Sequence, residues 1–143
     1  MMADEYLPIF VYGTLQRGEE RSGQWPHPPV TVQRATMQGI IRDLGAYPAL
    51  SEGEGTVLGE LWTVELIHFR ETLRVLDEIE CCGQEDVDLY VRRIVSCTME
   101  NGEQQRAHAY YFADPQAIYD KPLVSPDEHG VSHWRRHRRS CSA

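Results

Sequence analysis

Two extended runs joined by Asn101-Gly102 constrain the fold of this chain more than any other feature. Residues 89–100 and 103–113 are rich in β-branched and aromatic side chains, which favour strands. An Asn-Gly pair between two such runs is the strongest short-range signal for a β-hairpin. The sequence therefore predicts an antiparallel pair of strands in the second half of the chain.

The register of this hairpin decides which side chains share a face of the sheet. If Asn101 and Gly102 alone form the turn, Val95 faces His108, Arg93 faces Tyr110 and Arg92 faces Tyr111. The same turn opposes Glu100 and Glu103, and like charges directly opposite each other are unfavourable. The sequence therefore leaves the register open.

The rest of the chain predicts further strands and one helix. We expect strands at 9–11, 31–43 and 56–64, with a Gly/Glu-rich loop at 51–55. Residues 66–80 are predicted to be helical because apolar side chains recur there at three- and four-residue spacing, namely Leu66, Phe69, Leu73 and Leu76. These elements indicate a mixed α/β or β-barrel-like domain, and they do not specify the strand order.

The composition fits one domain that spans residues 1–143. Hydrophobic residues make up 41% of the chain and charged residues 25%, which is ordinary for a globular protein. No apolar run reaches membrane-spanning length and the N-terminus has no signal-peptide pattern, so we expect a cytoplasmic protein without a membrane partner. The net charge of −8 disfavours nucleic-acid binding. Nothing in the sequence indicates the oligomeric state.

The C-terminal residues, about 125–143, are expected to form a mobile Arg/His-rich tail. His129, His133 and His137 are spaced four residues apart, so on a helix they would share one face and could bind a metal. The segment lacks an apolar stripe that would hold such a helix, so we expect no metal site. The four cysteines form no Cys-x-x-Cys pair, and we expect them to be reduced.

The first predicted strand ends in a turn that suits an anion. The apolar run 9–11 leads into Tyr12, Gly13, Thr14 and Leu15, and glycine lets the backbone turn tightly and approach a ligand. Consecutive N–H groups exposed by such a turn favour a small carboxylate. The Gly-Lys-Ser/Thr ending of a phosphate loop is missing. An ordinary hairpin-like turn without a ligand is the alternative.

A carboxylate continues the apolar stripe of the predicted helix. At about 100° per residue, Glu80 projects within about 60° of Leu73, whereas Glu71 and Glu78 project to the opposite side. Burial disfavours the charged form of a carboxyl group and raises its pKa, so Glu80 is a candidate proton-transfer group near neutral pH. An exposed Glu80 beyond a frayed helix end is the alternative.

Residues 11–18, Val-Tyr-Gly-Thr-Leu-Gln-Arg-Gly, resemble the opening signature of the γ-glutamylcyclotransferase superfamily. The Gln-Arg-Gly continuation is most similar to the γ-glutamylamine branch and to related small bacterial members. Further matches follow in family order at Tyr47-Pro48, at 57–62 (Val-Leu-Gly-Glu-Leu-Trp), at 76–80 (Leu-Asp-Glu-Ile-Glu), at 89–92 (Leu-Tyr-Val-Arg) and loosely at 130–135. The resemblance implies an α+β fold, a small, mainly antiparallel β-barrel-like sheet with flanking helices.

The resemblance also implies a function. Enzymes of this superfamily cyclise a γ-glutamyl amine or conjugate to 5-oxoproline and release the free amine, without a metal or other cofactor. The last residue of the 76–80 match, Glu80, occupies the position of the catalytic acid/base. The expected partner is a small-molecule γ-glutamyl substrate, whose α-carboxylate we assign to the backbone N–H groups of Tyr12, Gly13, Thr14 and Leu15.

Three further residues are candidates for substrate binding or for supporting Glu80. Tyr90 and Arg92 lie two apart on one predicted strand and share a face, and Tyr111 joins them if the two-residue turn is correct. A simple Tyr/Arg packing pair is the alternative. The chain departs from the family at Phe112, where a hydroxyl is expected, and at Cys81-Cys82-Gly83. The alternative function is a non-catalytic module that binds a small carboxylate or a protein.

Overall fold

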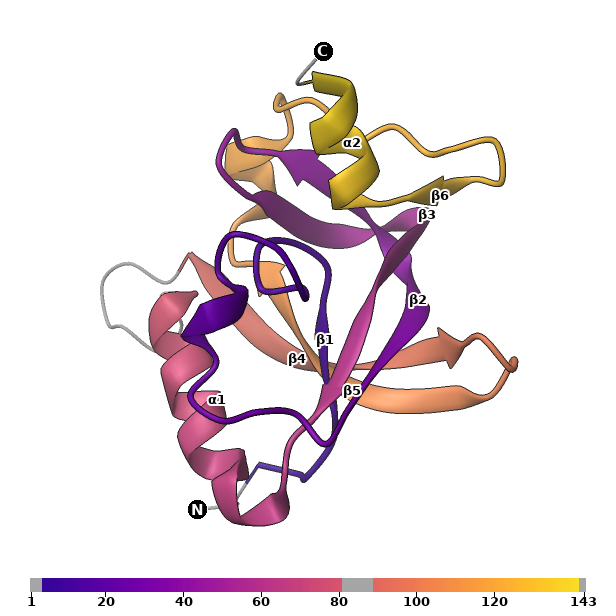
Figure 1. Cartoon of the computed structure of the whole chain (residues 1–143). Helices are drawn as coiled ribbons and strands as arrows, with labels where there is room; N and C mark the ends of the chain where they lie inside the picture. The colour runs from indigo at the N-terminus through magenta and orange to yellow at the C-terminus, as the bar shows by residue number, and fades with distance from the viewer. Residues whose placement is uncertain (1–3, 81–88, 142–143) are drawn as a thin grey trace.

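The computed structural model describes residues 4–80 and 89–141, which form a closed five-stranded barrel (Figure 1). Its strands are β1 (Ile9–Val11), β2 (Thr31–Asp43), β3 (Pro48–Thr63), β4 (Tyr90–Met99) and β5 (Gln104–Phe112). They are ordered β1-β5-β4-β2-β3, and β3 pairs with β1 to close the sheet. Only the β1–β5 pairing within the barrel is parallel. The predicted mainly antiparallel, barrel-like α+β fold is confirmed.

Strand β3 is longer than predicted, and the expected loop at 51–55 is wrong. The strand runs without interruption through these residues and pairs with β2 on both sides of an irregularity between Gln38 and Ile40. A Cβ on Gly55 would lie 2.8 Å from the carbonyl oxygen of Gly39, so only glycine fits there. The glycines that suggested a loop instead permit close packing inside a strand.

The β4–β5 hairpin differs by one residue from the register of a two-residue turn. Arg92 pairs with Tyr110, not with Tyr111. The connection is one residue longer than a two-residue turn, because the amide of Met99 donates to the carbonyl of Glu103 at 2.8 Å; Gly102, within the turn, has a φ of +88°. A one-residue shift moves every side chain to the other face of the sheet, so Tyr110 takes the position expected for Tyr111.

Strand alternation divides the buried side chains into two clusters. One cluster draws on all five barrel strands and includes Phe10, Met37 and Leu61, so it fills the barrel interior. The other packs α1 (Leu66–Ile79) against the outside of the barrel, and it includes Ile9 and Leu73. Helix α1 runs beside the barrel in Figure 1. This packing places the C-terminal end of α1 near the loop that follows β1.

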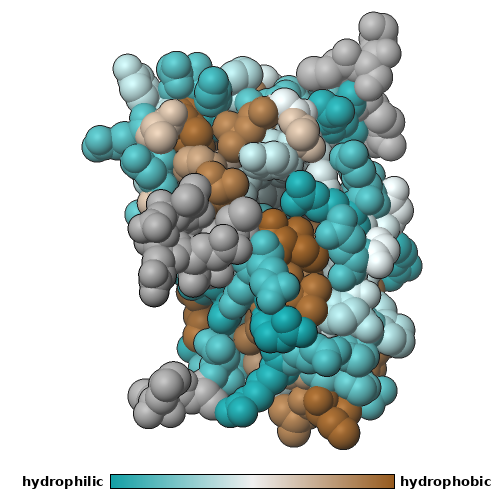
Figure 2. Space-filling view, turned by 90° about the vertical axis from the view of Figure 1, so that its left-hand side faces the viewer, coloured by the Kyte–Doolittle hydropathy of each residue, from teal (hydrophilic) through white to brown (hydrophobic). Residues whose placement is uncertain are grey.

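The predicted helix is confirmed to within one residue, but its first residue is not part of the buried face. Phe69, Leu73 and Leu76 are buried, whereas Leu66 is 68% exposed and its neighbour Ile67 is 82% exposed. The space-filling view of this side of the molecule is largely hydrophilic, with a hydrophobic patch at its lower end (Figure 2). The described residues contain no helix that is long and apolar enough to cross a membrane.

The C-terminal segment, as far as Cys141, packs on the barrel, whereas its composition suggested a tail. Strand β6 (Val131–Ser132) pairs in parallel with β3, and helix α2 (Trp134–Cys141) follows. Trp134 is only 1% exposed and joins the barrel core. The Ser132 hydroxyl donates to the carbonyl of Val124 at 2.9 Å. A single buried tryptophan therefore anchors a segment whose other residues are mostly polar.

Candidate functional site

A pocket lies where the end of β1, the loop after it and the last turn of α1 meet. Six of the residues predicted from the sequence line it, namely Tyr12, Gly13, Thr14, Leu15, Glu80 and Tyr90. The lining is completed by Phe10, Val11, Arg21, Tyr47, Pro48 and Tyr110. Two predicted site residues, Arg92 and Tyr111, do not line this pocket. Six predicted residues therefore line one pocket, together with Arg21, Tyr47 and Tyr110, to which the sequence analysis assigned no role in the site.

The loop after β1 presents its backbone to the pocket. Within the described residues, the amides of Gly13, Thr14 and Leu15 donate no hydrogen bond, so they are available to a ligand. A Cβ on Gly13 would lie 2.6 Å from the ring of Pro48, so no larger residue fits at this position. Glycine is therefore required here by the close approach of the first residue of β3.

A buried carboxylate on β3 fixes the far end of this loop. Glu60 is 8% exposed, and its Oε1 accepts hydrogen bonds from the amide of Arg17 at 2.7 Å and from the indole of Trp62 at 3.0 Å. Its Oε2 lies 3.6 Å from the guanidinium of Arg135 on α2. The C-terminal helix therefore supports the loop through Glu60. The signal in the sequence was a glutamate between apolar residues of a strand, to which we assigned no role.

Two tryptophans hold the middle of the same loop. The indole of Trp25 donates to the carbonyl of Leu15 at 3.0 Å, and its ring stacks on that of Trp62 at 4.2 Å between centroids. Because Trp62 is itself held by Glu60, the loop is fixed at both Leu15 and Arg17. Backbone amides held in this way are preorganised for a ligand.

Glu80 is the C-cap residue that directly follows α1, and it lines the pocket. Burial raises its pKa from 4.5 to about 7, and the nearby positive charge of Arg21 opposes that shift. Within the described residues, its carboxylate has no hydrogen-bond or ion-pair partner. A partly buried carboxyl group with a pKa near neutrality can both accept and donate a proton.

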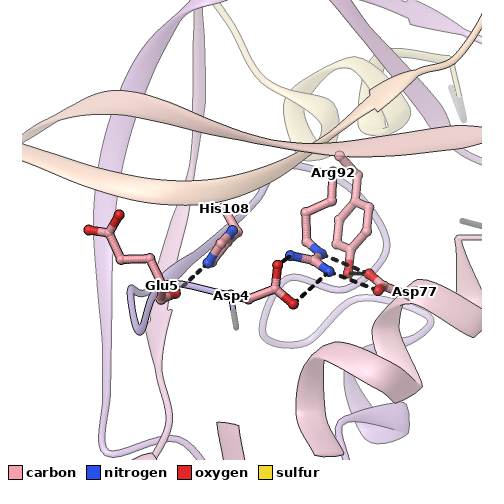
Figure 3. A network of polar contacts seen from close by, with 6 residues as sticks. Asp4, Glu5, Asp77, Arg92 and His108 are labelled. Carbon is pink, nitrogen blue, oxygen red and sulfur yellow. Dashed lines mark hydrogen bonds and ion pairs between the residues drawn. The ribbon is translucent and has the colours of Figure 1, made fainter. Parts of the chain in front are cut away.

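A second carboxylate, Asp77, lies one turn earlier on α1 and is fully engaged (Figure 3). Arg92 donates to it from Nε at 2.9 Å and from Nη2 at 3.0 Å, and the hydroxyl of Tyr110 donates at 2.6 Å. Burial opposes the charged form of Arg92, but its hydrogen bonds to Asp77 and Asp4 outweigh this and raise its pKa. Arg92 therefore ties α1 to β4, which positions the end of the helix and with it Glu80.

The same network also fastens the N-terminal segment. Arg92 Nη1 donates to the carboxylate of Asp4 at 3.0 Å, and Nε2 of His108 lies 2.7 Å from the carbonyl oxygen of Glu5 (Figure 3). His108 is buried, at 2% exposed. Residues 4 and 5 are therefore held against β4 and β5.

The remaining tyrosines of the pocket brace its walls. The hydroxyl of Tyr12 donates to the carbonyl of Tyr110 at 2.7 Å, and that of Tyr90 donates to the carbonyl of Pro48 at 2.9 Å. Burial raises the pKa of Tyr12 and of Tyr110, so both are neutral near pH 7. Tyr111 lies instead in the barrel core with its ring 5.0 Å from the guanidinium carbon of Arg93. The register of the hairpin accounts for its removal from the site.

The other candidate clusters do not converge. Among the described residues, no group of three His, Cys, Asp or Glu side chains could hold a metal. His133 lies 3.5 Å from Asp127, and His137 lies 2.8 Å from Asp43. Cys81 and Cys82 lie outside the described residues. Cys97 is buried and its pKa is raised by burial to about 12, so it is a poor nucleophile.

Comparisons with known proteins bear on both the fold and the site. The family model described as "Gamma-glutamyl cyclotransferase, AIG2-like" matches residues 9–135. A curated protein of Vibrio cholerae serotype O1, named "Putative gamma-glutamylcyclotransferase", is 38% identical over 86 residues, which are 59% of this chain and 67% of that protein. The family match includes the loop after β1, Glu80 and Glu60.

Two solved structures are similar across nearly the whole chain. An AIG2-like protein from Mus musculus has a TM-score of 0.63 and 25% identity, and the match covers 91% of this chain and 96% of the mouse protein. YkqA from Bacillus subtilis has a TM-score of 0.65 and 19% identity, and the match covers 96% of this chain. This chain spans only 43% of YkqA, so YkqA is evidence for the fold alone.

Proposed function

The chain belongs to the gamma-glutamyl cyclotransferase, AIG2-like family, and we propose that it cyclises a γ-glutamyl amine or conjugate to 5-oxoproline, with Glu80 as general base and then general acid. The observation that carries the proposal is the position of Glu80. Its carboxyl group has a pKa of about 7, and Glu80 lines the same pocket as Gly13, Thr14 and Leu15, whose amides are available to a carboxylate within the described residues.

The proposed reaction uses the substrate as its own nucleophile. Glu80 removes a proton from the α-ammonium, and the freed α-amine attacks the γ-carbonyl carbon to close a five-membered ring. The bond between that carbon and the leaving nitrogen then breaks, and Glu80 returns a proton to the departing amine. Because nucleophile and electrophile belong to one molecule, holding the substrate in a curled conformation supplies much of the acceleration.

The geometry supports the division of labour in this mechanism. The loop amides are neutral donors fixed by Trp25 and Glu60, which suits them to hold the α-carboxylate. Glu80 has a pKa near neutrality and, within the described residues, no competing partner, which suits it to proton transfer. The hydroxyls of Tyr12 and Tyr90 are engaged with backbone carbonyls and shape the pocket.

The test is release of 5-oxoproline by purified wild-type and Glu80→Gln protein from a panel of γ-glutamyl amines, γ-glutamyl dipeptides and glutathione. Glu78→Gln is the matched control, because Glu78 lies on the same helix and is exposed. We expect release by the wild type and by Glu78→Gln but not by Glu80→Gln. Binding of 5-oxoproline by the folded wild type without release from any substrate would favour a non-catalytic carboxylate-binding module.

A further inference from the structure

Arg21 places a positive charge inside the pocket. Its backbone amide donates to the carbonyl of Thr14 at 2.7 Å, so the residue is held beside the loop after β1. Its side chain lines the same pocket as Gly13 and Glu80, and its guanidinium carbon lies 5.7 Å from the ring centroid of Tyr47. Arg21 is therefore fixed at its backbone and directed toward the pocket at its side chain.

The guanidinium of Arg21 has no carboxylate partner among the described residues. Arg92, by contrast, pairs with both Asp77 and Asp4. Arg21 affects Glu80 only through space, where its charge opposes the rise in the carboxyl pKa. An arginine that is partly buried and left without an anion in the protein is suited to bind an anionic ligand.

The pocket also needs a cation on physical grounds. Backbone amides donate hydrogen bonds to an anion but do not neutralise its charge. A substrate carboxylate in this pocket would be repelled by Glu80 whenever Glu80 is ionised. A guanidinium beside the amides offsets that repulsion and replaces the water that the carboxylate loses on entering the pocket.

We propose that Arg21 binds the α-carboxylate of the substrate together with the amides of Gly13, Thr14 and Leu15, and that it makes the pocket selective for substrates with a free α-carboxylate. This inference rests on the proposed function. Arg21 lies outside the turn that the sequence indicated, and the substituent that it would recognise is the α-carboxylate. Tyr47 supports the guanidinium by packing against it.

The test compares two substrates that differ only at the α-position. One is a γ-glutamyl anilide with a free α-carboxylate, and the other is the same compound with an α-carboxamide. The preference is the ratio of their kcat/KM values, measured for wild type, Arg21→Gln and Arg21→Lys. Arg34→Gln is the control, because this substitution removes the same charge at a residue that is exposed on β2 and does not line this pocket.

We expect Arg21→Gln to lower the preference by about tenfold or more, because a charge-assisted hydrogen bond is lost only with the carboxylate substrate. Arg21→Lys should retain part of the preference, and Arg34→Gln all of it. An unchanged preference in Arg21→Gln would overturn the inference. This includes an equal loss of kcat/KM with both substrates, because a structural role of Arg21 would affect both substrates alike.

A binding measurement separates this inference from the proposed function. Calorimetry with 5-oxoproline and with 5-oxoprolinamide reports carboxylate recognition without turnover. If no γ-glutamyl compound is cyclised but the wild type prefers 5-oxoproline in an Arg21-dependent way, the inference holds and the proposed function fails. If the wild type cyclises substrates but the preference for 5-oxoproline does not depend on Arg21, the proposed function holds and the inference fails. Failure of the folded wild type to bind either compound overturns the inference.

Discussion

Asp77 and Glu80 are carboxylates one turn apart at the end of the same helix, and the protein treats them in opposite ways. Asp77 accepts two hydrogen bonds from Arg92 and one from Tyr110. Glu80 has no such partner within the described residues, and burial raises its pKa to about 7. The two residues lie at the same helix end and carry the same type of group, but they differ in their hydrogen-bond partners.

This difference distinguishes a carboxylate with a structural role from the one that we propose to be reactive. A carboxylate that accepts hydrogen bonds from a guanidinium and a hydroxyl connects elements of the fold, here α1 to β4 and β5. A desolvated carboxylate without a partner costs stability, and such groups are concentrated at functional sites. The hydrogen bonds of Asp77 hold the end of α1 against β4 and β5. They thereby also position Glu80, which directly follows the helix.

The largest effect should come from Glu80→Gln. General acid–base catalysis contributes about 10²–10⁴-fold, so we expect kcat to fall by that factor while the fold is retained. The unfolding midpoint should stay the same or rise, because an unpartnered buried carboxyl group is removed. Steady-state kinetics and thermal unfolding of the variant check both. Full activity in a folded Glu80→Gln variant would show that Glu80 is not the acid/base.

The next effect should come from Arg92→Ala, which leaves Asp77 and Asp4 without their shared partner. We expect the free energy of unfolding to fall by about 2–3 kcal/mol, less than for a fully buried pair. Arg74→Ala is the control, because its pair with Glu78 is exposed and should contribute less than about 0.5 kcal/mol. Urea denaturation measures both changes.

Arg92→Lys tests whether this network also positions Glu80. Lysine keeps the charge but cannot make the two-pronged contact with Asp77. We expect a folded protein with a lower kcat and a nearly unchanged KM, because the helix end shifts relative to the bound substrate. A stability loss with an unchanged kcat would limit Arg92 to a structural role.

A further effect should appear in the pH dependence of stability. The pKa of Glu80 is about 7 in the folded protein and near its ordinary 4.5 when unfolded. As pH rises from about 4.5 to about 7, the unfolded state loses this proton first, so the wild type loses stability relative to Glu80→Gln. Above that window the difference is constant. Urea midpoints of both proteins across this range measure it, and the opposite slope would indicate a partnered carboxylate.

Local patterns predicted much of this site from the sequence. The apolar stripe of α1 placed Glu80 at its end, and the strand-to-glycine transition located the loop at Gly13. Both depend on residues close together in the sequence, where periodicity and glycine preferences apply. Strand β2 was predicted with its observed bounds, Thr31–Asp43, for the same reason.

The contacts that the sequence missed join distant segments. Glu60 meets Arg17 and Arg135 across 43 and 75 positions of sequence, and only the closed barrel brings them together. The role of Trp134 as an anchor depends on a barrel core that composition does not describe. The register of β4–β5 is defined by the pairing of Met99 with Glu103 and of Thr98 with Gln104, which Asn-Gly alone does not determine.

The smallest effect tests that register directly, through two adjacent tyrosines. The Tyr110 hydroxyl donates to Asp77 at 2.6 Å, so Tyr110→Phe should lose about 1 kcal/mol of unfolding free energy. Within the described residues the Tyr111 hydroxyl makes no hydrogen bond, so Tyr111→Phe should change stability by less than about 0.5 kcal/mol. In an Arg92→Ala background the effect of Tyr110→Phe should change, because both side chains act on Asp77. A reversed order, with Tyr111→Phe the more costly, would indicate the two-residue turn and would return Tyr111 to the side of Asp77.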